Sequence, residues 1–520
     1  MQQPGSSGDD AAGAQPSTSR DPPQNDPQSN AARNSFIWHQ PTASFTPMFP
    51  THDYIPCKPT VAMTSTLQEI DSFKVFFPKS LCILIAQCTN ERTDLHNKKN
   101  ATIPQTDEDE VMILLGVMFV MCYNRLPNLS DYWSSNSPMG NQLIKNAISR
   151  NRFQILMSKL YFNHPEKPDN ATKLYYVEEL VNCMKHTFSN AMSESSHQSI
   201  DESMVKFKGD SVLKQYLPLK PMKRGVKVWQ RCDAQSGYIF DLNIYAGKTE
   251  NDEFSEGTLG ERVVTKLCST IKISDVVLSF DRFFTSVNLV HTLPFSAVGT
   301  VIKSRKNVPK FEKRLEKGES EFLATNSGVL ASRWLDSKEV IVMSNCSLPE
   351  TTSIKRKQKD GSKKQFQCPS AIALYNQIMG GVDLSDQKVN VYDFNRKSTK
   401  WWKKVFYKIQ MSAAINAHIF HQATTKKRTS LLKYLVKLAE ELVLTGRKSA
   451  RVKRKTNSIG GPRSKRAKEF LNVGDHLPVE SQGRRRCVRC AQTKTDKRTK
   501  YICAACQVPL CQGCFTSYHN

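Results

Sequence analysis

Three short segments carry aspartates that could bind divalent metal ions. They are SIDES at 199–203 with Asp201, SFDRFFTS at 279–286 with Asp281, and GGVDLSDQ at 380–387 with Asp383 and Asp386. Cleavage or transfer of a phosphodiester needs a polarised phosphoryl oxygen, a deprotonated nucleophile and a stabilised leaving oxygen. Two Mg²⁺ or Mn²⁺ ions about 4 Å apart supply all three when carboxylates hold them. The segments therefore predict metal-dependent phosphodiester chemistry.

Each aspartate taken alone also has a purely structural interpretation. Asp201 and Glu202 could form an exposed pair on a strand, Asp281 could cap the end of a strand, and Asp383 could cap a helix after two glycines. Acidic residues are common at such positions. The metal interpretation therefore depends on whether secondary structure brings the aspartates together.

The elements around these aspartates are those of an α/β fold. The sequence predicts strands at 199–207, 225–232 and 237–245, then a helix at 261–271 and a buried strand at 276–280. Asp201 then lies on a strand, and Asp281 follows the carboxyl end of another, where sites in mixed sheets tend to lie. The two side chains converge if these strands are neighbours. Asp383 and Asp386 share one face if a helix from Ala371 continues past the two glycines.

The 520-residue chain is long enough for several domains. The helical pattern before the strands includes Val111–Cys122, predicted to be a buried helix that Thr106 opens. The predicted organisation is a disordered leader at 1–34, a helical domain at 65–197, the first part of the core at 198–306, an insertion at 307–370, the last part of the core at 371–392, a second helical part at 393–446, a basic linker at 447–484 and a Cys-rich domain at 485–520.

With YLPLKPMKRGVKVW at 216–229 and YNQIMGGVDLSDQ at 375–387, the acidic segments resemble the piggyBac family of cut-and-paste transposases and their host-derived relatives. The resemblance runs from about residue 65 to the C-terminus. It implies an RNase H-like catalytic core with an inserted β-rich domain and flanking helical segments for dimerisation and DNA binding. It also implies that Asp201, Asp281 and Asp383 hold the catalytic metals and that Asp386 is needed for activity.

The reaction that the resemblance implies acts on double-stranded DNA. Water nicks the transposon ends, each freed 3′-hydroxyl attacks the opposite strand to give a hairpin, and the ends are joined at TTAA. Two hypotheses stay open: an active, dimeric transposase, or a domesticated nuclear protein that binds DNA or chromatin without transposition. A nuclease without strand transfer is a third. The Gly-rich segment often found ahead of the family's helical domain is only vaguely present, as FTPMFPT at 45–51.

Two groups of residues near the aspartates are predicted to contact DNA. Lys220, Lys223, Arg224 and Lys227 lie between or on the first two core strands, and Arg396, Lys397 and Trp401 follow the last aspartate. Cationic side chains would hold phosphates, and Trp401 could stack at a DNA end, while Trp402 is expected in the core. A solvated strand edge is the alternative for the first group.

Positive charge is concentrated at the C-terminal end. Residues 391–520 hold 29 Lys and Arg against 7 Asp and Glu, a net +22 of the chain's +26. A bipartite nuclear import signal, or a nonspecific DNA arm, has the form of Lys453, Arg454 and Lys455 separated by nine residues from Lys465 and Arg466. With no secretory signal and no apolar run of about 20 residues, we expect a nuclear protein that binds an import receptor, no membrane, and reduced cysteines.

The last 34 residues contain closely spaced soft metal ligands, which are Cys487, Cys490, Cys503, Cys506, Cys511, Cys514 and His519. Pairs of the form CxxC each supply two corners of a tetrahedral zinc site. A module this small would need metal to fold. Seven ligands predict one structural zinc, and a second zinc needs water, a residue such as His476, or a partner's side chain.

Overall fold

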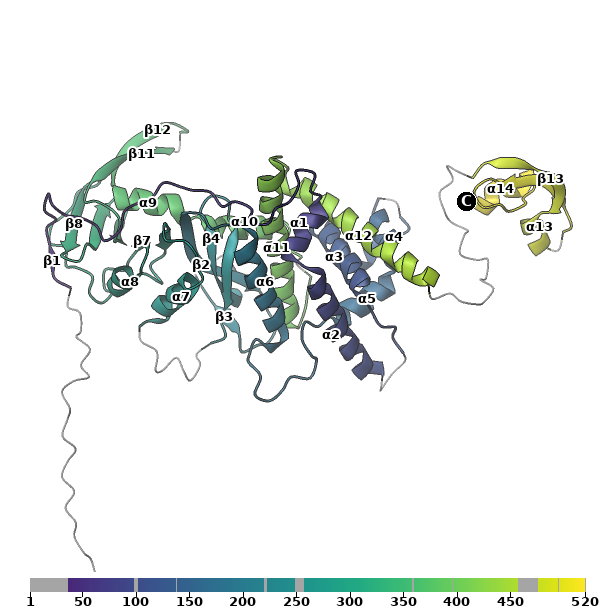
Figure 1. The fold of residues 1–520 in the computed structure, drawn as a ribbon, viewed down its shortest axis with the longest axis horizontal. Helices are drawn as coiled ribbons and strands as arrows, with labels where there is room; N and C mark the ends of the chain where they lie inside the picture. Colours follow the sequence, from purple (N-terminus) through teal and green to yellow (C-terminus); the bar gives the residue numbers. More distant parts are fainter. Residues whose placement is uncertain are drawn as a thin grey trace, which may run out of the picture. The chain divides into compact units, whose positions relative to one another are not determined.

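The computed structural model describes residues 36–97, 102–136, 138–218, 222–247, 257–357, 360–394, 396–456, 476–493 and 495–519. The predicted leader at 1–34 lies outside these ranges. The chain divides into two units, Met1–Arg447 and Lys448–Asn520, which are described separately (Figure 1). Among the described residues, none of the helices combines the length and the apolar character needed to cross a membrane.

A 10-stranded sheet forms the centre of the larger unit, in the order β1-β8-β9-β10-β7-β6-β2-β4-β3, with β5 paired to β4. Its middle strands, β7, β6 and β2, are parallel, whereas β4 runs antiparallel to both β2 and β5. This is the strand pattern of an RNase H-like core, as the resemblance implied. The strands are β1 (Trp38–His39), β2 (His197–Lys206), β3 (Lys214–Tyr216), β4 (Arg224–Asp233), β5 (Ile239–Ile244), β6 (Val277–Phe280), β7 (Ser296–Thr300), β8 (Ser320–Thr325), β9 (Leu330–Leu335) and β10 (Glu339–Ser344).

Two helices follow strands of this core and cover the sheet. Helix α7 (Leu259–Cys268) begins with a capping box in which Thr258 and Glu261 exchange hydrogen bonds. It buries Val263, Val264 and Leu267 in the same cluster as Phe280 of β6. Helix α8 (Val287–Thr292) begins at the Ser286 cap, just after the SFDRFFTS segment. The chain around Asp281 is therefore fixed by a buried strand before it and a capped helix after it.

The segment at 307–370 is rich in β-structure, but most of it is not a separate domain. Strands β8, β9 and β10 continue the main sheet, because β10 pairs with β7 over Val342↔Thr300 to Ser344↔Val298. Among the described residues of this segment, only β11 (Thr351–Lys357) and β12 (Lys363–Pro369) form a separate two-stranded sheet. The β-rich insertion predicted at 307–370 therefore extends the main sheet through β8, β9 and β10.

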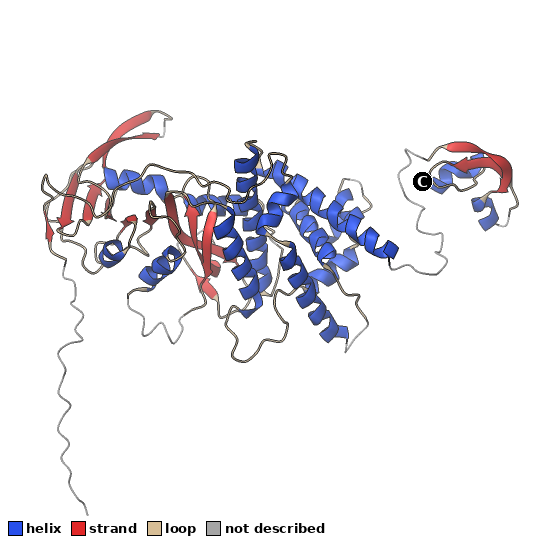
Figure 2. Cartoon of the chain, in the orientation of Figure 1, coloured by secondary structure: helices blue, strands red, loops and turns tan. Residues whose placement is uncertain are grey.

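The helical parts predicted before and after the core form one body, the group of blue helices that pack together beside the sheet in Figure 2. Helix α11 is buried along nearly its whole length and contacts α1, α6 and α10 (Gly381–Val391). The helices of this body are α1 (Glu69–Phe76), α2 (Lys79–Asn97), α3 (Glu108–Tyr123), α4 (Gln142–Ala147), α5 (Arg150–Lys159), α6 (Glu178–Ala191), α11 (Trp401–Thr425) and α12 (Leu431–Thr456).

Helix α3 confirms the buried helix predicted at Val111–Cys122, since every residue of that run is buried. Its cap differs from the prediction. The Asp107 side chain accepts a hydrogen bond from the Glu110 backbone N–H at 2.9 Å, while the Thr106 hydroxyl donates to the Glu110 carboxylate. Asp107 therefore satisfies one of the helix's free N–H groups, and its negative charge favours the helix N-terminus.

The helix that resumes near Ala371 does not run through the two glycines. Helix α9 (Ser370–Ile378) ends before them, and α10 (Gly381–Val391) begins at the second one. A Cβ on Gly381 would lie 2.6 Å from both the Asp233 carbonyl oxygen and the Ser199 hydroxyl. Only glycine therefore lets α10 approach β2 and β4 this closely.

The smaller unit contains an antiparallel hairpin and two short helices, which are β13 (Pro478–Arg486), β14 (Arg498–Cys503), α13 (Val488–Gln492) and α14 (Gln512–His519). The linker predicted at 447–484 overlaps regular structure at both ends, because α12 continues to Thr456 and β13 begins at Pro478.

Candidate metal centres

Three carboxylates come together where β2 and β6 pair. The parallel register aligns Ile200 with Phe280, so Asp201 and Asp281 follow at the same level of the sheet. One carboxylate oxygen from each of Asp201, Glu202 and Asp281 lies within 4.8 Å of the others. Backbone N–H groups orient two of them: Glu202 N donates to Asp201 at 2.7 Å, and Phe283 N donates to Asp281 at 2.8 Å. The neighbouring strands thus bring Asp201 and Asp281 together.

Asp383 and Asp386 lie on the first two turns of α10, beside this cluster. With Glu202 they line a cavity of about 1060 Å³. They share one face of α10 as their spacing predicted, although that helix begins after the glycines. Asp383 does not belong to the group of three converging carboxylates. Glu202 belongs to that group and also lines the cavity. Sequence reasoning treated Glu202 only as part of a strand pair, and its position next to Asp201 was the signal for a larger role.

A buried lysine fixes Asp386. The Asp386 carboxylate accepts hydrogen bonds from Lys408 Nζ at 2.5 Å and from the Ser203 hydroxyl at 2.6 Å. The Lys408 side chain is only 8% exposed, which makes this a largely desolvated ion pair. It joins α11, α10 and β2, three elements that the sequence places far apart.

The Lys408→Met variant is expected to lose about 3 kcal/mol of unfolding free energy, because it leaves Asp386 without its counter-charge. Urea denaturation followed by circular dichroism measures this loss. The double variant Lys408→Met/Asp386→Leu removes both charges and should recover part of the stability. A single variant as stable as wild type would show that the ion pair does not hold these elements together.

Cationic side chains predicted to contact DNA lie on the same cavity. Lys223 and Arg224 line it together with Asp383 and Asp386, and the Arg224 guanidinium lies 5.4 Å from the Tyr216 ring centroid. Lys227 is buried instead, with Nζ 4.6 Å from the Phe283 ring centroid. Lys220 lies outside the described residues. The cavity therefore combines a carboxylate side with a cationic side.

The second predicted DNA group divides between internal and surface roles. Arg396 donates to the carbonyl oxygens of Leu126 and Pro127 and to the Tyr132 hydroxyl. This guanidinium joins the loop before α11 to the first helical part, a structural role that sequence reasoning missed. Trp402 is 6% exposed, as expected for a core residue, whereas Trp401 is half-buried beside it.

Lys397 lines another cavity, of about 690 Å³, together with Lys400 and Lys403. Burial and, to a smaller extent, the positive charges of Lys400, Arg92 and Lys159 together lower the pKa of Lys403 to about 8. An anion entering this cavity would relieve that repulsion and favour the charged form of Lys403.

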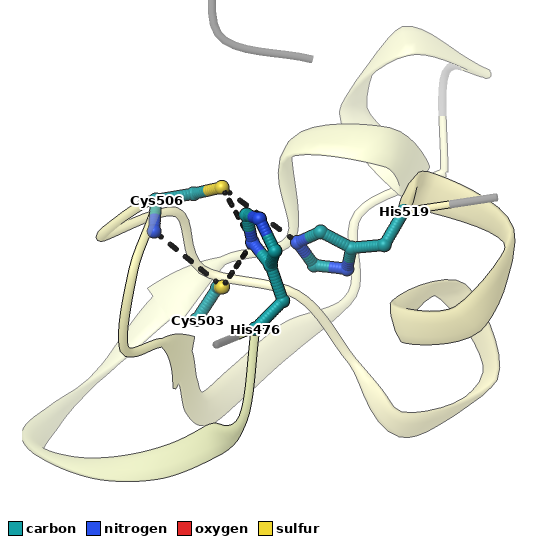
Figure 3. A group of neighbouring side chains, drawn as sticks. All are labelled: His476, Cys503, Cys506 and His519. Carbon is teal, nitrogen blue, oxygen red and sulfur yellow. Dashed lines mark hydrogen bonds between the residues drawn. The ribbon is translucent and has the colours of Figure 1, made fainter. Parts of the chain in front are cut away.

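The smaller unit holds two complete sets of four soft ligands. One set is Cys487, Cys490, Cys511 and Cys514, and the other is His476, Cys503, Cys506 and His519 (Figure 3). His476 therefore completes the second set, one of the three ways in which the sequence left the eighth ligand open. The two sets alternate along the chain, so the chain segment between the first and last ligands of one set contains ligands of the other set.

The geometry of both sets fits zinc. Backbone N–H groups of Cys511 and Cys506 donate to the sulfurs of Cys487 and Cys503 at 3.3 and 3.5 Å, which favours thiolates. Burial raises the pKa of Cys487, but hydrogen bonds from the backbone and side chains of Cys490 and Cys511 outweigh it and lower the pKa to about 7. His519 Nδ1 donates to the Phe515 carbonyl oxygen at 2.8 Å, which leaves Nε2 to bind metal.

The sheet order and the acidic cluster, on the middle of β2 and just after β6, are those of DDE-type transposases. Residues 68–418 match the family described as Transposase IS4, and residues 474–520 match a zinc finger described as DDE_Tnp_1-like. The chain belongs to the Transposase IS4 family and is of its piggyBac type.

Several human proteins are similar to this chain. "PiggyBac transposable element-derived protein 3" is 26% identical over 425 residues, which cover 79% of this chain and 70% of that protein. The "Chimeric ERCC6-PGBD3 protein" has the same identity over 425 residues and is covered to 39%. "PiggyBac transposable element-derived protein 2" is 26% identical over 371 residues, covering 68% of this chain and 62% of that protein.

A solved structure shares the fold. The cryo-EM structure of a piggyBac transposase synaptic complex with hairpin DNA matches with a TM-score of 0.68 and 23% sequence identity. The match covers 88% of this chain and 100% of the solved chain.

Proposed function

We propose that this chain is a metal-dependent DNA transposase of the cut-and-paste kind. The observation that carries the proposal is the convergence of Asp201, Glu202 and Asp281 beside a cavity that also holds Asp383 and Asp386. The matching solved complex contains hairpin DNA, which supports hairpin formation as one step of a reaction that begins with nicking and ends with joining at TTAA. The proposed substrates are transposon terminal repeats and a target duplex.

The carboxylate set fits Mg²⁺ or Mn²⁺, since these ions prefer oxygen ligands. When bound, two such ions would polarise the phosphoryl oxygen and lower the pKa of the attacking water. Asp201, Asp281 and Asp383 would hold them, and the N–H donors of Glu202 and Phe283 keep two of these carboxylates in place.

The cationic side of the cavity would position the DNA. Lys223 and Arg224 would contact phosphates, which orients the backbone without reading its sequence. Asp386, paired with Lys408, would act as a fixed support for α10.

A cell-based excision assay tests the proposal. The reporter carries this element's own terminal repeats, and the readout is precise excision that restores TTAA. Excision by the wild-type chain supports a transposase. Binding of the repeats without excision supports the domesticated DNA-binding protein, and cleaved ends without hairpins or joined products support a nuclease.

We also propose that the chain forms a homodimer, that it binds one or two structural zinc ions, and that it enters the nucleus through an import receptor. Lys453, Arg454 and Lys455 lie in the last turns of α12, whereas Lys465 and Arg466 lie outside the described residues.

Changing these five import residues to Gln is expected to move a fluorescent fusion of the chain from the nucleus to the cytoplasm, because the import receptor's acidic grooves lose their counter-charges. The nuclear-to-cytoplasmic fluorescence ratio measures the change. The exposed triplet Lys426, Lys427 and Arg428, changed to Gln, is the matched control and should leave the ratio unchanged. Nuclear accumulation of the five-residue variant would place the signal elsewhere.

A further inference from the structure

The β11–β12 hairpin is a two-stranded ribbon separate from the main sheet. Its strands pair in register from Thr351↔Pro369 to Lys357↔Lys363. Figure 1 shows it extending away from the rest of the larger unit, beyond α9. The ribbon therefore presents its own surface.

One face of the ribbon fastens it to the main sheet. Residues directly opposite each other in an antiparallel pair point to the same side, so Ile354 and Phe366 share a face with Arg356. The Arg356 guanidinium pairs with Asp336 at 2.5 Å and lies 5.0 Å from the Trp334 ring centroid. Trp334 is on β9 and Asp336 directly follows that strand. Contacts within the chain therefore occupy this face at Arg356, whereas Lys364, directly opposite it, is exposed.

The other face is polar, cationic and exposed. It carries Ser353 opposite Gln367, Lys355 opposite Gln365, and Lys363. Ser353, Lys355, Lys363, Gln365 and Gln367 are all exposed. Lysines alone would be accounted for as protection of an open strand edge against aggregation. That role does not account for the two glutamine amides and the serine hydroxyl on the same face.

We propose that this face of the β11–β12 ribbon enters the major groove of double-stranded DNA, an inference that rests on the proposed function. The major groove is about 12 Å wide and admits a two-stranded β-ribbon. Glutamine amides there donate to and accept from adenine, and serine bonds either kind of base edge. Lys355 and Lys363 neutralise phosphates on the walls of the groove.

The ribbon is also connected to the acidic site. Strand β12 leads at Ser370 directly into α9, and α9 leads into α10, which carries Asp383. Helix α9 contacts both strands of the ribbon as well as β2 and β6. DNA held by the ribbon would thus be held by the same continuous segment that places Asp383.

Two binding measurements on the zinc-loaded full chain test the proposal, using a random-sequence 30-base-pair duplex. For Lys355→Gln/Lys363→Gln, the slope of log K against log salt should become shallower by about 1.8, because each phosphate contact contributes about 0.9. Raising the salt concentration from 50 to 200 mM weakens DNA binding by a factor that should be about 12-fold smaller for the variant than for the wild type. The control Lys167→Gln/Lys173→Gln removes two exposed charges from a loop of the helical body and should keep the wild-type slope.

The second measurement uses the same duplex with 7-deazaadenine in place of adenine, which removes an acceptor only from the major groove. The wild type should bind it about tenfold more weakly than the normal duplex, since a good amide–adenine pair contributes about 1–3 kcal/mol. Gln365→Ala/Gln367→Ala should reduce this discrimination at least about fivefold. Thermal unfolding should be unchanged, because the altered side chains are exposed.

Each result decides the matter. A shallower slope with unchanged discrimination would place the ribbon on the DNA backbone and overturn the groove assignment. If both variants keep the wild-type salt slope and the wild-type discrimination, the ribbon does not bind DNA. In that case, a loss of affinity for a polyglutamate peptide in Lys355→Gln/Lys363→Gln would assign the face to an acidic protein. Neither measurement requires catalysis, so failure here is distinguishable from failure in the excision assay.

Discussion

The Asp281→Asn variant is expected to excise the reporter at least about a thousandfold more slowly than the wild type. Asn removes the negative charge that would hold a divalent ion, and about 4 kcal/mol of lost transition-state stabilisation corresponds to this factor. Asn keeps the side-chain oxygen that accepts from the Phe283 N–H. The local turn should therefore persist, and thermal unfolding should match the wild type.

Asp275→Asn is the matched control for this experiment. Asp275 is exposed and lies just before β6, at the opposite end of the strand from Asp281. The Asp275→Asn variant should excise the reporter at the wild-type rate, measured in the same reporter cells. An Asp281→Asn variant with undiminished excision would show that the acidic cluster is not the catalytic centre.

The elements around the acidic cluster could be predicted because their signals are local. A buried apolar run followed by Asp281, and an alternating segment with Asp201, indicated the two strands. Their convergence depended on the pairing of β2 with β6, which joins residues about 80 positions apart. A local pattern indicates that a strand exists but does not select its partner. For the same reason, the addition of β8, β9 and β10 to the main sheet could not be predicted from the 307–370 segment.

Other parts of the site depend on contacts that spacing does not encode. The break between α9 and α10 follows from the close approach of Gly381 to Asp233 and Ser199, which exists only once the sheet has formed. The ion pair of Lys408 with Asp386 likewise joins two helices at a buried point. A lysine in a helical pattern is normally taken as a solvated residue, so its burial was missed.

The zinc module offered the opposite situation, because the ligand types were evident while the grouping was not. CxxC spacing identified three pairs, but it did not show that the pair at 503 and 506 would meet His476 and His519. His476 precedes its nearest partner in the set by 27 residues. Because the ligands of the two sets alternate along the chain, the folded structure and not the spacing decides which cysteines and histidines share a site.

The His476→Ala variant is expected to lower the zinc content of the full chain from two ions to one. It removes the fourth ligand of the set that contains Cys503, Cys506 and His519, and leaves the all-cysteine set complete. Elemental analysis of the purified protein measures the ratio of zinc to chain. His164→Ala, at an exposed histidine of the larger unit, is the control and should keep two zinc ions.

The same loss should unfold the Cys503 side of the module, because little else stabilises it. Among its described residues, the buried hydrophobic cluster of the smaller unit consists of Cys487, Leu510 and Cys511. Structural zinc contributes about 10–16 kcal/mol to the folding of zinc-finger peptides, far more than so small a core can supply. Faster amide hydrogen exchange in β14 should accompany the lost ion. Two zinc ions retained by His476→Ala would mean that water or another residue completes the second set, as the sequence alone had allowed.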